Sequence, residues 1–367
     1  MKKLTEEEKA RYAALAHRRQ ERNLIRKAKE RKDPGRSARL RSIRKARYQA
    51  FSSPIYELAV PERLSLKDNY DQVVKLVQDM RMIALSERQR VGLNFGGVTE
   101  VGPATALYVA AEVYRCRHIQ EGQRRVTGKH PADRKIARLL KEMGFNDLLG
   151  IDDPTVSDEA PDVEYIPFSS SNRVDGTFAR ELRQALEHGS AAISPEVRRV
   201  MYGSLTEAMA NVIHHAYPSG AERDYIFMQS RWWMAGSIDR SKNELMMMLY
   251  DQGVGIPNTI PRTHPVEHWG GLLSSLGVRP DDGNMIKVAT MLGRTQTGEE
   301  HRGRGLQDVI EFVRVSEQGD LRILSNRGEY TYNSDGSDSV CTRRRDLGGT
   351  LIQWRVSRSS AGSDGHA

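Results

Sequence analysis

Apolar and polar residues alternate at helical spacing between residues 204 and 218, in SLTEAMANVIHHAYP. The apolar positions fall on one face at a spacing of about 3.6 residues, which predicts a helix; they are Leu205, Met209, Val212, Ile213 and Ala216. Glu207, Asn211 and His215 are each four residues apart, so they form one row along the helix. An ordinary amphipathic helix with a polar outer face would show the same row. Whether these three residues form a functional site is therefore judged from the segments that follow.

The remaining pattern alternates between strands and helices, which predicts a mixed α/β (α+β) protein. Strands are expected at 90–95, near 125–126, at 163–166 (stopped by Pro167), at 225–233 and at 245–250. Helices are expected at 70–84, from 102–105 to about 118, at 131–143 and at 177–187. We expect Trp232 and Trp233 to be packing residues.

Domain boundaries follow from Pro-, Ser- and acid-rich stretches. These stretches predict linkers at 51–66 and 156–162, which separate a compact domain at 67–155 from a larger one at 163–357. Residues 1–50 are expected to form a basic helical arm, and residues 358–367 a flexible tail.

Asp251 follows a wholly apolar run, LMMMLY, which is typical of a buried strand. Its carboxylate could accept a hydrogen bond from an exocyclic amine such as N6 of adenine. Gly253 and Gly255 would let the backbone turn tightly and let a flat ring approach. On the neighbouring helix, the amide of Asn211 is a suitable ligand for a Mg²⁺ ion that also carries phosphate oxygens. The Glu207 carboxylate could orient or deprotonate a water.

A second glycine pair, Gly303 and Gly305, precedes a helix expected to begin near Leu306. Backbone N–H groups at such a helix start can hold phosphate. Residues 257–302 form a long insertion rich in Gly and Pro, and an insertion of this length is usually functional or mobile.

The order and spacing of these motifs resemble those of the GHKL, or Bergerat-fold, ATPases, over roughly residues 163–357. Glu207-x-x-x-Asn211 resembles the N box of that family, Asp251-x-Gly253-x-Gly255 its first glycine box, and Gly303-Arg304-Gly305-Leu306 its second. The Asn-x-x-x-His-x-Tyr pattern is closest to the anti-sigma serine kinases.

The resemblance implies an α/β sandwich that binds ATP with Mg²⁺ at Asn211, with Glu207 as the catalytic residue. It makes the 257–302 insertion an ATP lid, in which Arg294, Thr295 and Arg302 could reach phosphates or be plain surface residues. Together with the motifs above it implies an ATP site formed by Asn211, His215, Asp251, Gly253, Gly255, Arg294, Thr295, Gly303, Arg304, Gly305, Leu306 and Thr350.

The segment VGLNFGGVTEVGPATALYVAAEVYR, with GFNDLLGI further on, resembles the STAS domain over roughly residues 67–155. The phosphoacceptor serine of such domains aligns with Ala104, which has no hydroxyl. The resemblance therefore implies a binding or dimerisation module without the phosphorylation switch, and a homodimer is possible.

The formal charge of +8 is confined to the arm, which carries +12 and leaves −4 for the remainder of the chain. The arm could be a solvated hairpin, a nucleic-acid-contacting segment or a dock for a partner. Two distant cysteines predict no disulfide framework, and a start without an apolar core suits a cytoplasmic protein. No apolar stretch is long enough to predict a membrane span.

Three functions remain open. The first is a Mg²⁺-dependent ATP-binding and ATP-hydrolysing regulatory protein whose lid closure gates the binding of a protein partner. The second is a serine/threonine protein kinase of the anti-sigma type that acts on a separate STAS partner. The third is a nucleotide-gated protein that binds nucleic acid through residues 1–50.

Overall fold

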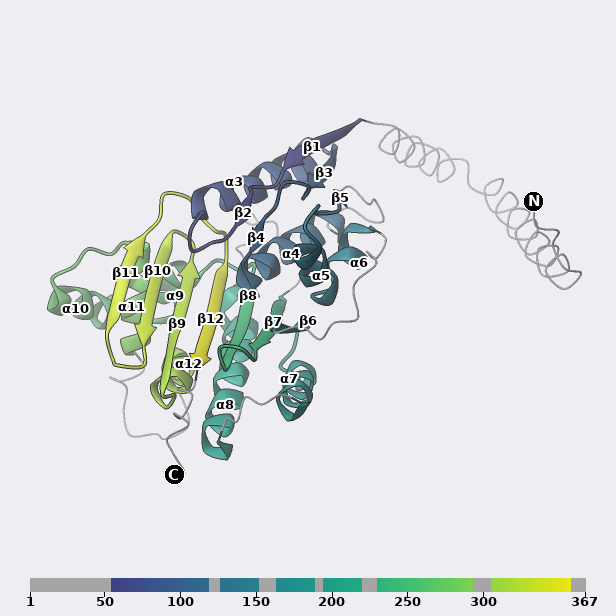
Figure 1. Cartoon of the computed structure of the whole chain (residues 1–367). Helices are drawn as coiled ribbons and strands as arrows, with labels where there is room; N and C mark the ends of the chain where they lie inside the picture. The colour runs from purple at the N-terminus through teal and green to yellow at the C-terminus, as the bar shows by residue number, and fades with distance from the viewer. Residues whose placement is uncertain are drawn as a thin grey trace, which may run out of the picture. The chain divides into compact units, whose positions relative to one another are not determined.

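The fold is built on a seven-stranded antiparallel sheet in the order β11-β10-β9-β12-β8-β7-β6 (Figure 1). The computed structural model describes residues 54–118, 126–151, 163–188, 194–219, 230–292 and 305–357. The strands are β6 (Val163–Ser171), β7 (Trp232–Asp239), β8 (Glu244–Asp251), β9 (Gln318–Ser325), β10 (Gly328–Asn333), β11 (Asp338–Thr342) and β12 (Thr350–Ser357). Residues 55–357 of these ranges belong to one compact unit.

One face of this sheet is covered by a layer of helices that includes the one carrying Glu207, Asn211 and His215. These are α7 (Thr177–His188), α8 (Pro195–Asn211), its π-helical continuation η2 (Val212–Ala216) and α12 (Gly305–Arg314). The Ser194 hydroxyl caps the start of α8 by accepting from the amide of Val197, and Pro195 occupies the first turn, where no amide is needed. Alternate strand residues such as Leu249 and Ile352 pack against these helices.

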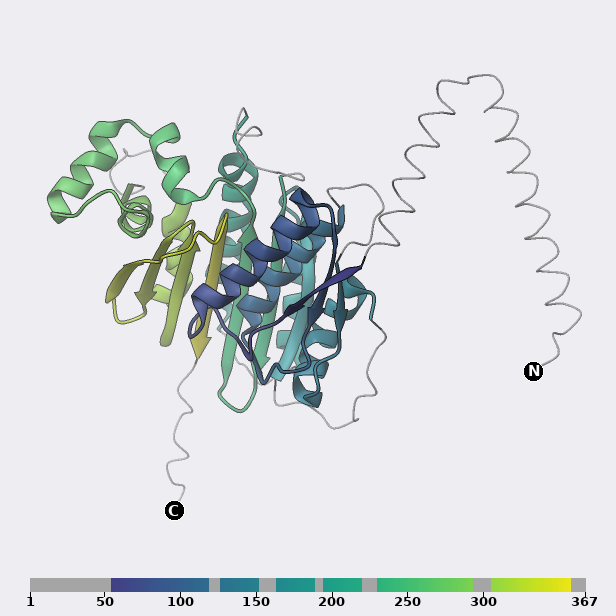
Figure 2. The ribbon, with the colours of Figure 1, turned by 90° about the horizontal axis from the view of Figure 1, so that it is seen from above.

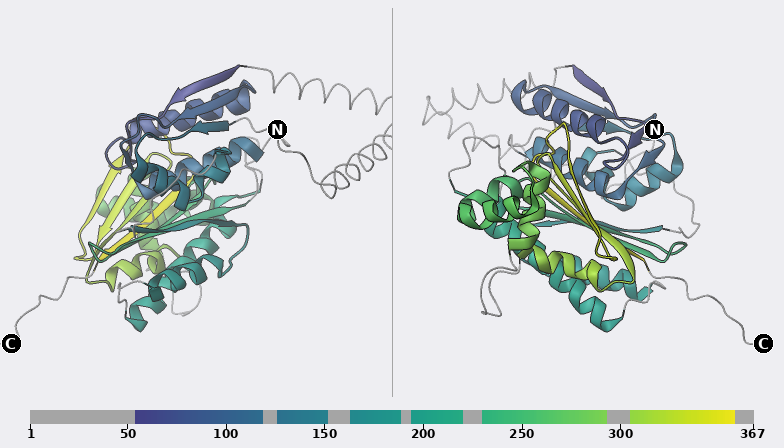
Figure 3. Two further views of the ribbon diagram at one scale, coloured as in Figure 1. Left: turned by 45° about the vertical axis from the view of Figure 1, so that its right-hand side comes forward. Right: turned by 90° about the vertical axis from the view of Figure 1, so that its left-hand side faces the viewer.

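The opposite face of the sheet is covered by the described residues 55–118 and 126–151, which we call the 55–151 segment. It holds the three-stranded parallel sheet β1 (Ile55–Ala59), β3 (Arg90–Asn94) and β5 (Val126–Lys129), and the short pair β2 (Arg63–Leu64) and β4 (Glu100–Val101). Its helical elements are α3 (Tyr70–Arg81), η1 (Met82–Ser86), α4 (Pro103–His118), α5 (Arg134–Glu142) and α6 (Phe145–Leu149). Figure 3 shows the large sheet between these elements and the layer of α7, α8 and α12.

Helix α4 lies between the two sheets, with contacts to β5 on one side and to β7, β8 and β12 on the other. Its residues are therefore buried around nearly the whole circumference, including Ala106, Tyr108 and Val113 at no measurable exposure. The core of the 55–151 segment continues directly into Tyr250 and Leu351 of the large sheet. A single hydrophobic core thus joins the two parts that the sequence predicts as separate domains.

Three further helices, α9 (Ile256–Thr263), α10 (Val266–Leu276) and α11 (Asp282–Leu292), stand beside the β9–β11 end of the sheet (Figure 2). They enclose a small core of their own around Ile260, Leu273 and Val288. The insertion expected at 257–302 is therefore folded into helices over most of residues 256–292. Pro257 occupies the first turn of α9, where proline is tolerated, and Pro261 lies inside that helix.

The mixed α/β class is confirmed, but three boundaries need correction. The predicted linker at 51–66 contains β1, which pairs with β3, and β2. Strand β6 does not stop at Pro167, because a bulge after Ile166 lets it continue to Ser171. Of the strand expected at 225–233, residues 225–229 lie outside the described residues, and the described strand β7 runs from Trp232 to Asp239, beyond the expected end.

Other expectations concern packing, the membrane and the ends of the chain. Both Trp232 and Trp233 are buried, as predicted. Within the described ranges, no helix combines the length and apolar character needed to cross a membrane. The basic arm at 1–50, the linker at 156–162 and the tail at 358–367 lie outside the described residues.

Because the hydrophobic clusters on the two faces of the large sheet belong to one compact unit, we expect truncations on either face to destabilise the same cooperative unit. Leu324 faces the 55–151 segment and Leu321 faces α12, and both are buried. Leu324→Ala and Leu321→Ala should each lower the free energy of unfolding by about 2–5 kcal/mol in urea denaturation. Val315→Ala, at a 40% exposed site, should change it by less than about 0.5 kcal/mol. A Leu324→Ala protein as stable as the Val315→Ala control would contradict this arrangement.

Candidate functional site

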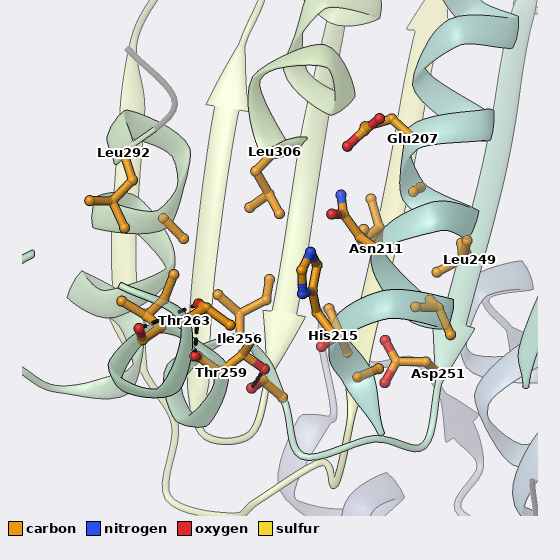
Figure 4. A pocket seen from close by; sticks show the side chains of 18 of the residues that line it. Glu207, Asn211, His215, Leu249, Asp251, Ile256, Thr259, Thr263, Leu292 and Leu306 are labelled. Atoms are coloured by element: carbon orange, nitrogen blue, oxygen red, sulfur yellow. Dashed lines mark hydrogen bonds between the residues drawn. The ribbon is translucent and has the colours of Figure 1, made fainter. Parts of the chain in front are cut away.

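A cavity of about 400 Å³ lies between the Glu207 row, the ends of β8 and β12, and helices α9, α11 and α12 (Figure 4). Its volume is in the range of small-molecule sites. The lining residues are Glu207, Ala208, Asn211, Val212, His215, Ala216, Leu249, Asp251, Gly255, Ile256, Thr259, Ile260, Thr263, His264, Ala289, Leu292, Leu306, Thr350 and Ile352.

The three polar side chains of the row point into this cavity one below another, with Asp251 beyond His215 (Figure 4). Four residues of α-helix rise about 6 Å, so Glu207 and Asn211 stand one turn apart. After Asn211 the helix widens into the π-turn η2, a distortion that is frequent at functional sites. The amide nitrogen of Asn211 is buried and has no hydrogen-bond partner among the described residues. A buried polar atom in this state is expected to meet a ligand or water.

Glu207 and His215 both have pKa values shifted toward their neutral forms. Burial raises the pKa of the Glu207 carboxyl, and the nearby negative charge of Asp308 raises it further. Burial also lowers the pKa of His215, helped by His214 and by His264. A carboxylate with a raised pKa is a better proton acceptor, which suits general-base chemistry.

Asp251 is the most perturbed acid of the cavity. It ends β8 with 4% of its surface exposed, and one carboxylate oxygen accepts from the Gly253 amide at 2.8 Å. Burial raises its pKa to about 7, although hydrogen bonds from Gly253 and Thr350 and the charge of Arg115 oppose the shift. A buried acid that titrates near neutrality in a cavity is typical of a functional site.

Neighbouring protein atoms leave no room for a side chain at Gly253 and Gly255, the two glycines after Asp251. A Cβ at Gly253 would lie 2.2 Å from the carbonyl oxygen of Ala216, which also accepts from the Val254 amide at 2.8 Å. Gly255 has a φ of +84°, and a Cβ there would lie 2.3 Å from the side-chain oxygen of Asn326. The turn is therefore held tightly against the end of η2, which is a reason for glycine that the sequence did not reveal.

Three side chains that sequence analysis did not assign to the site hold the backbone of this turn. The Tyr217 hydroxyl accepts from the Gln252 amide at 2.9 Å and donates to the Arg231 carbonyl at 2.8 Å. The Ser325 hydroxyl accepts from the Ile256 amide at 2.8 Å. The Asn326 amide donates to the Val254 carbonyl at 3.1 Å. Ser325 and Asn326 follow this turn by about 70 residues in the sequence, and the fold brings them next to it.

Most of the predicted site residues come together. Glu207, Asn211, His215, Asp251, Gly255, Leu306 and Thr350 line the cavity. Thr350 pairs with Asp251 across β12 and β8, and its hydroxyl lies 2.9 Å from that of Ser325. Gly253 supports the turn and is not part of the lining, and Gly305 begins α12. Arg294, Thr295, Gly303 and Arg304 lie outside the described residues.

The protein atoms of the cavity do not form a metal site by themselves. In the described part of the chain, no group of three or more His, Cys, Asp or Glu side chains could hold a metal ion. Any ion here would need most of its ligands from a bound molecule or water, as Mg²⁺ commonly does in phosphate sites.

No protein-family model matches the sequence of this chain, and no curated protein matches it significantly.

We expect Asp251→Asn to stabilise the ligand-free protein, and more so at pH 8 than at pH 5. The pKa of Asp251 rises from 3.8 to about 7 on folding. Its contribution to stability is therefore complete below pH 3.8 and is lost as the pH rises through 7. Asparagine does not titrate, so the variant avoids this loss, which is at most about 4 kcal/mol.

Urea denaturation of wild type and variant between pH 5 and 8 measures the difference. Asp239→Asn is the control, because burial is outweighed at Asp239 by its bonds to Lys242 and Ser241, which lower its pKa. Its effect should not vary over this pH range. If the free energies of unfolding of wild type and Asp251→Asn differ by the same amount from pH 5 to pH 8, the pKa of Asp251 is not raised into this range.

Proposed function

We propose that this chain is a Mg²⁺-dependent ATP-binding and ATP-hydrolysing protein, with the nucleotide in the cavity described above. The observation that carries the proposal is the pairing, within one cavity, of a buried acid at one end with Glu207 and the unpartnered Asn211 amide at the other. Leu249, Ile256 and Ile352 supply apolar surface between these ends, which suits a flat base and a sugar.

Asp251 is the group proposed to recognise adenine. The exocyclic N6 amine of adenine is a donor, whereas guanine carries an acceptor oxygen at the equivalent position. A buried carboxylate that already accepts from Gly253 retains further acceptor capacity on its two oxygens. Because Asp251 is buried, its ionised form is costly, and a further hydrogen bond from a bound base would relieve part of that cost.

Asn211 is the residue proposed to hold Mg²⁺ through its amide oxygen. Its buried amide nitrogen, which has no partner among the described residues, would donate to a phosphate oxygen beside the ion. When bound with the phosphates, Mg²⁺ would neutralise charge that develops during phosphoryl transfer. Glu207 would orient the attacking water and accept its proton, and its raised pKa favours that task. The start of α12 at Gly305 would offer backbone N–H groups to phosphate.

The experiment that tests the proposal is incubation with ATP labelled at the γ-phosphate, alone and with host lysate. Release of labelled inorganic phosphate supports hydrolysis. Transfer of label to a protein would instead support the serine/threonine kinase alternative, because Glu207 could equally serve a serine hydroxyl as base. Nucleic-acid binding through residues 1–50 is a proposal that depends on a segment outside the described residues. Partner binding gated by lid closure is also a proposal, and residues 293–302 of the expected lid lie outside the described residues too.

Asp251→Asn should lower ATP affinity at least about tenfold, because a charge-assisted hydrogen bond of about 1.5–3 kcal/mol is replaced by a weaker one. Wild type should bind GTP poorly. Calorimetric titration with ATP and GTP measures both affinities. Asp239→Asn is the matched control, since Asp239 ends the neighbouring strand β7, at the opposite end of the strand pair from Asp251. If wild type binds ATP and GTP with equal affinity, the proposal that Asp251 recognises adenine is wrong.

Asn211→Ala and Glu207→Gln should separate binding from turnover. Loss of the Asn211 amide should abolish Mg²⁺-dependent nucleotide binding together with phosphate release. Glu207→Gln should keep ATP affinity within a few-fold but slow phosphate release by about 10²–10⁴-fold, the usual contribution of a general base. Glu196→Gln, in the exposed first turn of the same helix, is the control. If Glu207→Gln hydrolyses ATP at the wild-type rate, Glu207 is not the general base.

A further inference from the structure

The side chain of Glu112, in α4, is an ionisable group buried at the boundary between α4 and the large sheet, with no surface exposed. Burial opposes its ionisation, but the positive charges of Arg115 and Arg81, with hydrogen bonds from Arg81 and Tyr250, hold its pKa below the usual range. The group is therefore a carboxylate at neutral pH, at the cost of losing all contact with water.

Glu112 binds the two residues that flank Asp251. The Tyr250 hydroxyl lies 2.8 Å from one carboxylate oxygen, and the Gln252 amide nitrogen donates to that oxygen at 2.9 Å. Arg81 donates to the other oxygen at 2.6 Å. Because side chains alternate along a strand, Tyr250 and Gln252 face α4 while Asp251 faces the cavity. Glu112, a side chain of the 55–151 segment, thus binds the residues before and after Asp251, the proposed adenine acceptor.

The same segment also holds the loop that leads to Thr350, the partner of Asp251. The Tyr108 hydroxyl donates to the Leu347 carbonyl at 3.0 Å, and the Tyr250 hydroxyl lies 2.7 Å from the Gly348 carbonyl. Gly349 follows with a φ of +116°, and a Cβ there would lie 2.1 Å from the Asp251 carbonyl oxygen. Asp251 therefore has little room to move while this loop is in place.

We propose that Glu112 is a positioning residue of the nucleotide site, which fixes Asp251 for base recognition by holding Tyr250 and Gln252. The inference rests on the proposed ATP-binding function. It makes the 55–151 segment part of the site that selects the base, although within the described residues it contributes no side chain to the cavity lining. A purely structural role for Glu112 would instead affect every ligand of the cavity equally.

The chain supplies a matched control in Glu329 of β10. This buried carboxylate also lies between two arginines, accepting from Arg322 and Arg343 at 2.6 Å each. Arg322 in turn donates to the Leu66 carbonyl, so the cluster also joins the large sheet to the 55–151 segment. By register Glu329 is level with Tyr250 but three strands away, about 14 Å at the usual strand spacing.

The experiment compares Glu112→Gln with Glu329→Gln in the full-length chain. Calorimetry measures affinity for ATP, for GTP and for tripolyphosphate, which has no base, all with Mg²⁺. We expect Glu112→Gln to lose at least about tenfold in ATP affinity and most of the preference for ATP over GTP, with tripolyphosphate affinity unchanged within about twofold. Glu329→Gln should leave all three affinities within about twofold of wild type.

Gln252→Met provides a second variant if Glu112→Gln folds poorly. It removes the donor to Glu112 while keeping the side-chain volume and the bond between Glu112 and Arg81. It should show the same loss of base preference to a smaller degree. Parallel loss of ATP and tripolyphosphate affinity in the Glu112 and Gln252 variants, or unchanged ATP affinity, would overturn the inference. A wild-type protein that binds tripolyphosphate but has no preference for ATP over GTP would overturn adenine recognition itself.

Discussion

Burial of β8 on both faces is the constraint on which the rest of the structure depends. Every side chain from Leu245 to Tyr250 is partly or fully buried, because helices α8 and α12 cover one face of the sheet and α4 covers the other. On the face toward α8 the strand offers only the apolar side chains of Leu245, Met247 and Leu249 until it ends at Asp251, which supplies the first carboxylate after them. The carboxyl of Asp251 is therefore buried together with the strand, and this burial raises its pKa.

Local patterns were sufficient to predict the helix row and the buried strand. Glu207, Asn211 and His215 share a face because of helical periodicity alone, and Asp251 follows a run whose length and composition indicate a buried strand. The same reasoning placed α3, α4 and α7 within a few residues of their observed bounds. Elements whose burial is visible in their own sequence could thus be predicted.

Elements that depend on distant partners could not be predicted. Strand β1 is exposed over most of its length and gains its backbone partners only from β3, so its sequence was interpreted as a linker. Ser325 and Asn326 act on the Asp251 turn through single hydrogen bonds that no spacing rule encodes. The same holds for the joining of the two predicted domains, because Tyr250 and Leu351 look like ordinary core residues whichever partner covers them.

The position of α4 between two sheets also limits how the chain can be divided. A fragment beginning at Val163 would keep the whole cavity lining but would present Trp233, Tyr250 and Leu351 to water. Such a continuous apolar surface favours self-association over a soluble monomer. The large sheet therefore needs the 55–151 segment as its permanent cover, and a shortened version would have to replace that cover with polar side chains before it could be studied alone.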